Sequence, residues 1–225
     1  MKKVERLGAA TAPDGTVLTL YRHDGAYSIR VDGVELMSTR RHHSEDRLAE
    51  LVCEPLRLVP RARVLIGGLG LGFTLGAALR SLAADAHVVV AEIVAEVIRW
   101  NENPEYALGG AALRDQRVEL RHEDVARVLR ASRGTFDGIM LDVDNGAEPL
   151  TTAGNARLYR SAGIEMAVAA LRPGGRLAYW SAYVDPALEA SLRQAGLTVD
   201  VSRVRAHRTS GAWHMLYVGR VSPPA

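Results

Sequence analysis

The chain has 225 residues and a formal net charge of +2 at pH 7, with 48% hydrophobic and 24% charged residues. This length suits one α/β domain with at most a small appendage, and the composition is that of a globular protein. Basic residues are scattered and no apolar run approaches ~20 residues, so we expect neither a nucleic-acid-binding surface nor a membrane span.

The cysteine, the histidines and the N-terminal residues bear on three further classes of protein. Cys53 is the single cysteine, so no internal disulfide can form, and the histidines lack the paired spacing of metal ligands. Residues 1–6 include two lysines with no apolar stretch behind them, so we expect no secretory signal. These features predict a cytoplasmic protein without a metal site.

The first part of the chain has the pattern of β structure. Residues 17–21, 27–31 and 34–37 read as three short strands, separated by turns at 23–25 and 32–33. Such a three-strand meander is too small to stand alone and must pack on something else. We therefore divide the chain into a small N-terminal β segment, residues 1–40, and a main domain, residues 41–225.

The main domain opens with a helix over residues 44–58, for which Ser44 is the expected N-cap. Strands and helices then alternate. The predicted strands are 64–66, 87–91, 117–120, 136–141 and 176–180, and the predicted helices are 71–82, 94–101, 125–131, 155–171 and 186–195. This alternation predicts a doubly wound, mostly parallel α/β sheet covered by helices on both faces. The last two strands, 197–204 and 213–221, have no helix between them, so we expect an antiparallel C-terminal hairpin.

Ligands of such sheets lie beyond the carboxyl ends of the strands, and the first strand ends in a run of glycines. Gly67, Gly68, Gly70 and Gly72 allow a tight turn into the next helix and let the backbone approach a ligand closely. Many nucleotide-binding folds share such a turn. A purely structural turn between strand and helix is the alternative.

The next two strands end in acids that suit a nucleoside. Glu92 lies about 20 residues beyond the glycines, where an acid accepts hydrogen bonds from both ribose hydroxyls. Asp124 follows the third strand and can accept a hydrogen bond from an adenine amino group. Either acid can instead cap the helix that follows it, and for Asp124 both roles are compatible.

The fourth strand ends at Asp142, which is followed by Asp144 and Asn145. Two carboxylates at a strand end would hold a cationic amine or take its proton as it attacks. The alternative is a loop whose acids cap the following helix. Acids after the third and fourth strands argue against a hydride-transfer enzyme, because a nicotinamide enzyme needs only the glycines and the acid after the second strand.

Aromatic residues and histidines supply further candidates. Tyr179, Trp180 and Tyr183 follow the fifth strand and are expected to wall an acceptor pocket, with core packing as the alternative for Trp180. Trp100 is expected in the core or over a cofactor. The candidate general bases are His42, His43, His207 and His214, although the adjacent pair has the pattern of surface residues.

Most of the chain resembles the spermidine synthase family, which shares the class I methyltransferase fold. Residues 31–38 are similar to the end of that family's N-terminal β domain and residues 44–49 to the helix after it, while residues 64–72 resemble its glycine motif. Residues 158–159 and 171–175 also fit.

The resemblance implies a Rossmann-like fold and a homodimer. It also implies roles for three acids: Glu92 as the ribose-binding acid, Asp124 as the adenine-contacting acid, and Asp142 as the acid that deprotonates the attacking amine.

Three departures from the family pattern bear on the cofactor and the acceptor. Gly70 stands where the family usually has an aspartate that favours the amine end of decarboxylated S-adenosylmethionine. Intact S-adenosylmethionine carries a carboxylate that such an aspartate would repel, so Gly70 favours the intact cofactor. Leu36 replaces a glutamine, Asn145 replaces a second loop aspartate, and the family's Asp-Pro is missing.

These observations predict a cytoplasmic transferase that uses S-adenosylmethionine to methylate a small amine. Catalysis would rest mostly on positioning, because a displacement at a sulfonium gains from aligned and desolvated partners. Aminopropyl transfer from decarboxylated S-adenosylmethionine to a diamine is the first alternative. A non-catalytic, nucleoside-binding paralogue is the second.

Overall fold

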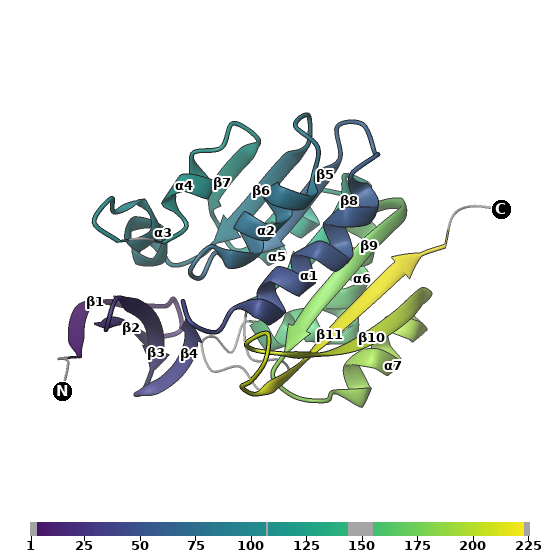
Figure 1. Cartoon of the computed structure of the whole chain (residues 1–225). Helices are drawn as coiled ribbons and strands as arrows, with labels where there is room; N and C mark the ends of the chain where they lie inside the picture. Colours follow the sequence, from purple (N-terminus) through teal and green to yellow (C-terminus); the bar gives the residue numbers. More distant parts are fainter. Residues whose placement is uncertain (1–3, 107, 144–154, 223–225) are drawn as a thin grey trace.

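The computed structural model describes residues 4–106, 108–143 and 155–222, which form a seven-stranded sheet and a separate four-stranded sheet (Figure 1). The large sheet consists of β5 (Arg63–Gly67), β6 (His87–Glu92), β7 (Val118–His122), β8 (Phe136–Leu141), β9 (Leu171–Ser181), β10 (Leu197–Arg205) and β11 (Trp213–Val221). Its strand order is β10-β11-β9-β8-β5-β6-β7. Strands β5 to β9 are parallel, whereas β11 runs antiparallel to both β9 and β10, as the sequence predicts.

Helices cover both faces of the large sheet, and alternation along the strands explains why. The first face carries α1 (His43–Cys53), α2 (Phe73–Ser81) and α3 (Ala95–Glu102), and the second carries α5 (Val125–Arg130), α6 (Ser161–Ala170) and α7 (Pro186–Gln194). Along β5, Val64 and Ile66 enter the first core while Leu65 enters the second. Successive strand residues point to opposite faces, so an apolar run supplies two cores at once.

The small sheet has four strands, one more than the sequence predicts. It comprises β1 (Glu5–Thr11), β2 (Val17–His23), β3 (Ala26–Val31) and β4 (Val34–Ser38), in that order. Strand β1 escapes prediction because Gly8-Ala9-Ala10 has weak β propensity, and pairing with β2 fixes it. Leu18 and Ile29 join the core of the first face, so this sheet does pack on the main domain.

Several predicted boundaries are wrong. Helix α1 begins at His43 with His42 at its N-cap, and Ser44 is a helical residue whose hydroxyl serves other contacts. The predicted helix 155–171 is two elements, the 3₁₀ helix η2 (Asn155–Tyr159) and α6, because the chain is extended at Arg160. The short elements η1 (Glu54–Leu56) and α4 (Gly110–Leu113) complete the described structure.

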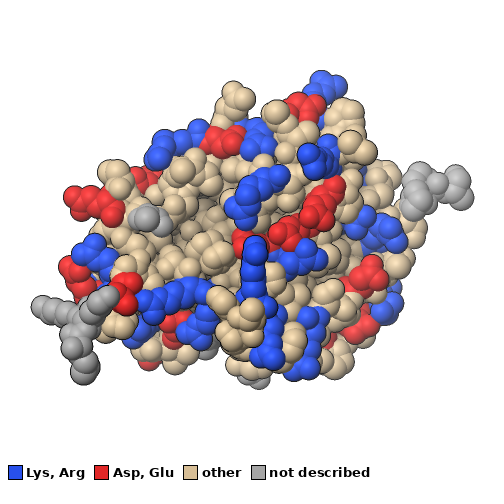
Figure 2. Space-filling model, in the orientation of Figure 1, with Lys and Arg blue, Asp and Glu red and all other residues tan. Residues whose placement is uncertain are grey.

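Acidic and basic side chains are interspersed over the face seen in Figure 2. Among the described residues, every helix is too short or too polar to cross a membrane.

Candidate active site

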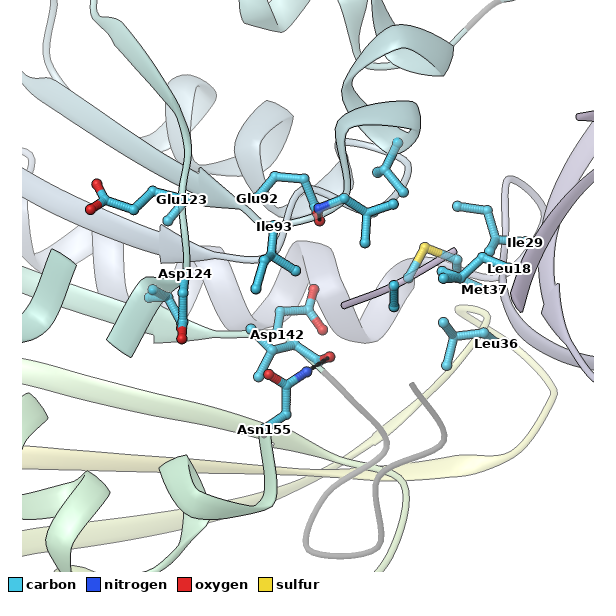
Figure 3. A pocket seen from close by; sticks show the side chains of 18 residues that line it. Leu18, Ile29, Leu36, Met37, Glu92, Ile93, Glu123, Asp124, Asp142 and Asn155 are labelled. Atoms are coloured by element: carbon cyan, nitrogen blue, oxygen red, sulfur yellow. Dashed lines mark hydrogen bonds between the residues drawn. The ribbon is translucent and has the colours of Figure 1, made fainter. Parts of the chain in front are cut away.

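The carboxyl ends of four neighbouring strands meet at one cavity, which we call the first cavity. Gly68 and Gly70 follow β5, Glu92 ends β6, Asp124 follows β7 and Asp142 follows β8, and all five line it. Figure 3 shows the three acids on one side of this cavity and Leu18, Ile29, Leu36 and Met37 of the small sheet on the other. Strands remote in sequence thus bring their terminal acids to a shared cleft.

Two of the four predicted glycines form the cavity wall. Gly68 has φ +89°, and a Cβ there would lie 2.5 Å from the main-chain oxygen of Asp142. Gly70 has φ +52°, and a Cβ there would lie 2.7 Å from Sδ of Met37. Left-handed backbone and close approach both require glycine at these positions.

The other two glycines pack behind the wall and do not line the cavity. A Cβ at Gly67 would meet Leu141 Cδ2 at 2.8 Å, and one at Gly72 would meet the Gly109 Cα at 2.7 Å. Gly72 is also the left-handed N-cap of α2. Their role is to bring strand, turn and helix close together.

Glu92 ties the glycine turn to the start of α3. It is only 7% exposed, and its two carboxylate oxygens accept hydrogen bonds from the main-chain N–H groups of Leu69 (2.9 Å) and Val94 (2.8 Å). Burial raises the pKa of Glu92, while these N–H donors act in the opposite direction. Each carboxylate oxygen has a second lone-pair site, so the group can still accept hydrogen bonds from a ligand.

Asp124 caps a helix and faces the cavity at the same time. Its Oδ1 accepts a hydrogen bond of 2.8 Å from the main-chain N–H of Ala126 in the first turn of α5. The neighbouring Glu123 forms an ion pair with Arg127, and its carboxylate points away from the cavity in Figure 3. Asp124 is therefore the acid at this strand end that a ligand would meet.

Asp142 lies where two cavities meet. Its Oδ2 accepts a hydrogen bond of 2.7 Å from Oγ1 of Thr74 on α2, and burial raises its pKa to about 6. Asn155, at the start of η2, also lines the first cavity and donates to the main-chain oxygen of Val143. A carboxyl group with this pKa is mostly ionised at neutral pH and can accept a proton.

A second cavity adjoins the first on the α1 and α2 side. It shares Leu36, Met37, Gly70, Asp142 and Val143 with the first cavity. Its other lining residues are Glu45, Leu69, Leu71, Phe73, Thr74 and Trp180. Asp142 is the acid common to both spaces, so a group bound in one cavity and a group bound in the other would meet at its carboxylate.

No family model and no curated protein matches the sequence. Solved structures do match. A spermidine synthase in complex with the transition-state analogue AdoDATO has a TM-score of 0.75 and 16% identity over 99% of this chain and 75% of its own. The spermidine synthase from Thermotoga maritima has a TM-score of 0.72 and 17% identity over 97% of this chain and 74% of its own.

A third match is a methyltransferase. It is the 1,6-didemethyltoxoflavin-N1-methyltransferase from Burkholderia thailandensis with bound 1,6-didemethyltoxoflavin and S-adenosylhomocysteine. The TM-score is 0.55 and the identity 22%, over 80% of this chain and 79% of that one. The chain has a spermidine synthase-like class I methyltransferase fold.

In this spermidine synthase-like fold, two residues predicted to wall the acceptor pocket, Tyr179 and Tyr183, line neither cavity. Tyr179 is fully buried in the core of the second face, where its hydroxyl donates to the main-chain oxygen of Leu158. Trp180, one residue later on β9, points to the opposite face and lines the second cavity. Tyr183 is 66% exposed and lines neither cavity. Asp144 and Asn145 lie outside the described residues.

Of the four candidate histidines, His214 contacts Trp180, which lines the second cavity. Its Nδ1 is 2.9 Å from Oγ of Ser44, and its ring packs edge-on against Trp180. His42 stacks on Phe73 and contacts Asp46, His43 begins α1, and His207 sits in the exposed β10–β11 loop. Trp100 belongs to the core of the first face, beside Gly8.

The lining residues that were not predicted from the sequence as site residues include Met37, Glu45, Thr74 and Asn155. Glu45 and Thr74 lie on helices packed over the sheet, and no spacing rule connects them to a strand end. The acidic pair Glu45-Asp46 at the start of a helix is the one signal that pointed toward Glu45, and that pattern usually marks a helix terminus.

Proposed function

We propose that this protein is an S-adenosylmethionine-dependent transferase that methylates a small amine. The observation that carries the proposal is the convergence of Glu92, Asp124 and Asp142 on one cavity beside Gly68 and Gly70. Two acids there suit the hydrogen-bond donors of an adenosine, and the third suits an amine. A cytoplasmic location and a homodimer remain part of this proposal.

The described residues fit an adenosyl cofactor. Gly68 and Gly70 line the first cavity without side chains, so a ligand can lie directly against the backbone there. Glu92 would accept hydrogen bonds from ribose hydroxyls, since its oxygens keep lone pairs beyond those used by Leu69 and Val94. The carboxylate of Asp124 would accept a hydrogen bond from the adenine amino group. When bound, the sulfonium supplies an electrophilic carbon and a neutral thioether leaving group.

Gly70 supports the intact cofactor over the decarboxylated one. The Cβ of an aspartate at position 70 would lie 2.7 Å from Sδ of Met37, so Met37 would have to move. Leu36 and Met37, which line both cavities together with Gly70, carry no charge. A cofactor carboxylate is therefore not repelled by an acid at position 70 itself.

Asp142 would act on the amine. Its carboxylate, held by Thr74, faces both cavities and so touches the reacting nitrogen in this proposal. A base whose pKa of about 6 lies just below neutral pH is mostly ionised and still accepts a proton readily. Holding the amine against the electrophilic carbon supplies most of the rate acceleration through proximity.

Aminopropyl transfer to a diamine is the second candidate. Its support is the four-stranded sheet before the main domain, together with alignment of 99% of the chain to a spermidine synthase. Leu36 and Gly70 weigh against it, because both lack the polar groups expected of that reaction.

Calorimetric titration with intact and with decarboxylated S-adenosylmethionine separates the candidates. We expect the intact cofactor to bind at least about tenfold more tightly, a difference of roughly 1.4 kcal/mol. Tighter binding of the decarboxylated form would favour aminopropyl transfer. Binding of either form without turnover of any amine would favour the non-catalytic alternative.

A further inference from the structure

The second cavity contains two carboxyl groups that arrive from different parts of the fold. Glu45 extends from the first turn of α1, and Asp142 follows β8. Each is fixed by one hydroxyl group: Ser44 Oγ lies 2.5 Å from Glu45 Oε2, and Thr74 Oγ1 lies 2.7 Å from Asp142 Oδ2. Glu45 and Thr74 lie on helices, and neither belongs to the strand ends that form the first cavity.

Among the residues that the structure describes, neither carboxyl group forms an ion pair. The titratable groups around Glu45 are Asp46 on its own helix, Asp142 opposite and His214 on β11, which Ser44 links to Glu45. Arg41, before α1, acts on His214 and forms an ion pair with Glu35. Asp46 is engaged by Arg80 and His42. Burial, and then Arg41, lower the pKa of His214 to about 4, so this ring is uncharged at neutral pH. The negative charge of the pair is thus left for a ligand.

We propose that Glu45 is a second acceptor-binding acid, which together with Asp142 holds the ammonium group of a small amine in the second cavity. The inference rests on the proposed function and identifies the substrate class as a cationic amine. Ser44 is a positioning residue in this account, since its hydroxyl joins Glu45 to the ring of His214.

The charge of the two carboxyl groups suits this ligand. Burial, and next the Asp142 carboxylate, raise the pKa of Glu45 to about 8, while burial raises that of Asp142 to about 6. The pair therefore carries about one proton at pH 7. An ammonium ion between the carboxyls favours ionisation of both, so its binding expels that proton to solvent.

Every proton and charge of the transfer is then accounted for. One carboxylate takes a proton from the ammonium group and exposes the nitrogen lone pair. That lone pair forms the N–C bond as the C–S bond breaks, with its electron pair passing to sulfur. The product nitrogen carries the positive charge that sulfur loses, and the proton stays on the carboxyl group.

Calorimetry with 1,4-diaminobutane as the probe tests the inference without turnover. The protein is first saturated with methylthioadenosine, whose binding reports the first cavity alone. We expect Glu45→Gln to weaken diamine binding at least about tenfold and to leave methylthioadenosine binding unchanged. Repeating the titration at pH 7 in buffers of different ionisation enthalpy counts released protons: close to one for the wild type and near none for Glu45→Gln.

Two further variants separate charge from structure. Glu50→Gln removes another carboxylate from α1, one paired with Arg47 outside the cavity, and should bind the diamine as the wild type does. Glu45→Asp keeps the charge and should lose less affinity than Glu45→Gln.

Three outcomes overturn the inference: unchanged diamine binding by Glu45→Gln, equal losses in Glu45→Asp and Glu45→Gln, or a wild type that binds methylthioadenosine but not the diamine. Failure of the wild type to bind methylthioadenosine would instead count against the proposed function.

Discussion

The two adjoining cavities are built in different ways. The first is made by strand ends: its glycines have left-handed backbone, and its acids Glu92 and Asp124 are held by main-chain N–H groups. The second shares Gly70 and Asp142 with the first but adds side chains from α1, α2 and β9, and its acid Glu45 is held by the hydroxyl of Ser44.

This difference predicts a difference in tolerance. Main-chain hydrogen bonds and glycine turns fix the first cavity through the backbone, so it can recognise one constant ligand. Side-chain contacts in the second cavity can change without altering the sheet, so it can be adapted to one acceptor or another. Asp142 belongs to both and couples them.

We expect the largest effect from replacing Asp142, because this acid lines both cavities. Asp142→Asn keeps the shape and an oxygen for the Thr74 hydrogen bond but removes the base. We expect turnover of the acceptor amine to fall by about 10²- to 10⁴-fold, the usual contribution of general-base catalysis. Methylthioadenosine affinity should stay within several-fold, because the first cavity is held by other groups.

Asp200→Asn is the matched control, since it neutralises an exposed aspartate on β10. Turnover of that variant should equal that of the wild type. Normal turnover by Asp142→Asn would remove Asp142 from the chemistry.

The same difference explains how much the sequence could predict. Glu92, Asp124 and Asp142 were predictable because parallel strands end at one edge of the sheet, so position in the chain fixes position in space. Glu45 was not, because its place in the cavity depends on how α1 packs over the sheet. Tyr179 was assigned to the wall wrongly because the face taken by each residue of β9 depends on register.

The pH dependence of stability tests the arrangement of the two carboxyl groups in the second cavity. The pKa values of Glu45 (about 8) and Asp142 (about 6) lie above those of the unfolded chain. The folded state therefore binds these protons more tightly, so their contribution to stability is present below about pH 4 and is lost as pH rises through 6 and 8. Without Glu45, the stability of the folded state should therefore fall less as the pH rises.

Thermal melts of the wild type and Glu45→Gln between pH 5 and 9 measure this effect. We expect the melting temperature of the variant to rise relative to the wild type by several degrees over that range. Burial and Arg41, which lower the pKa of His214 to about 4, are retained in Glu45→Gln, so we expect the contribution of His214 to cancel in the difference. A difference that does not change with pH would mean that Glu45 is not held next to Asp142.

The central claim, that an adenosine lies in the first cavity, is tested most directly by thermal melts with methylthioadenosine. At a hundredfold excess over Kd, binding stabilises the folded state by about 2.7 kcal/mol, which corresponds to a rise of roughly 5 to 10 °C for a chain of this size. Gly68→Ala, which places a Cβ 2.5 Å from the Asp142 main-chain oxygen, should lose most of that rise. An unchanged melting temperature of the wild type at millimolar methylthioadenosine would contradict the account.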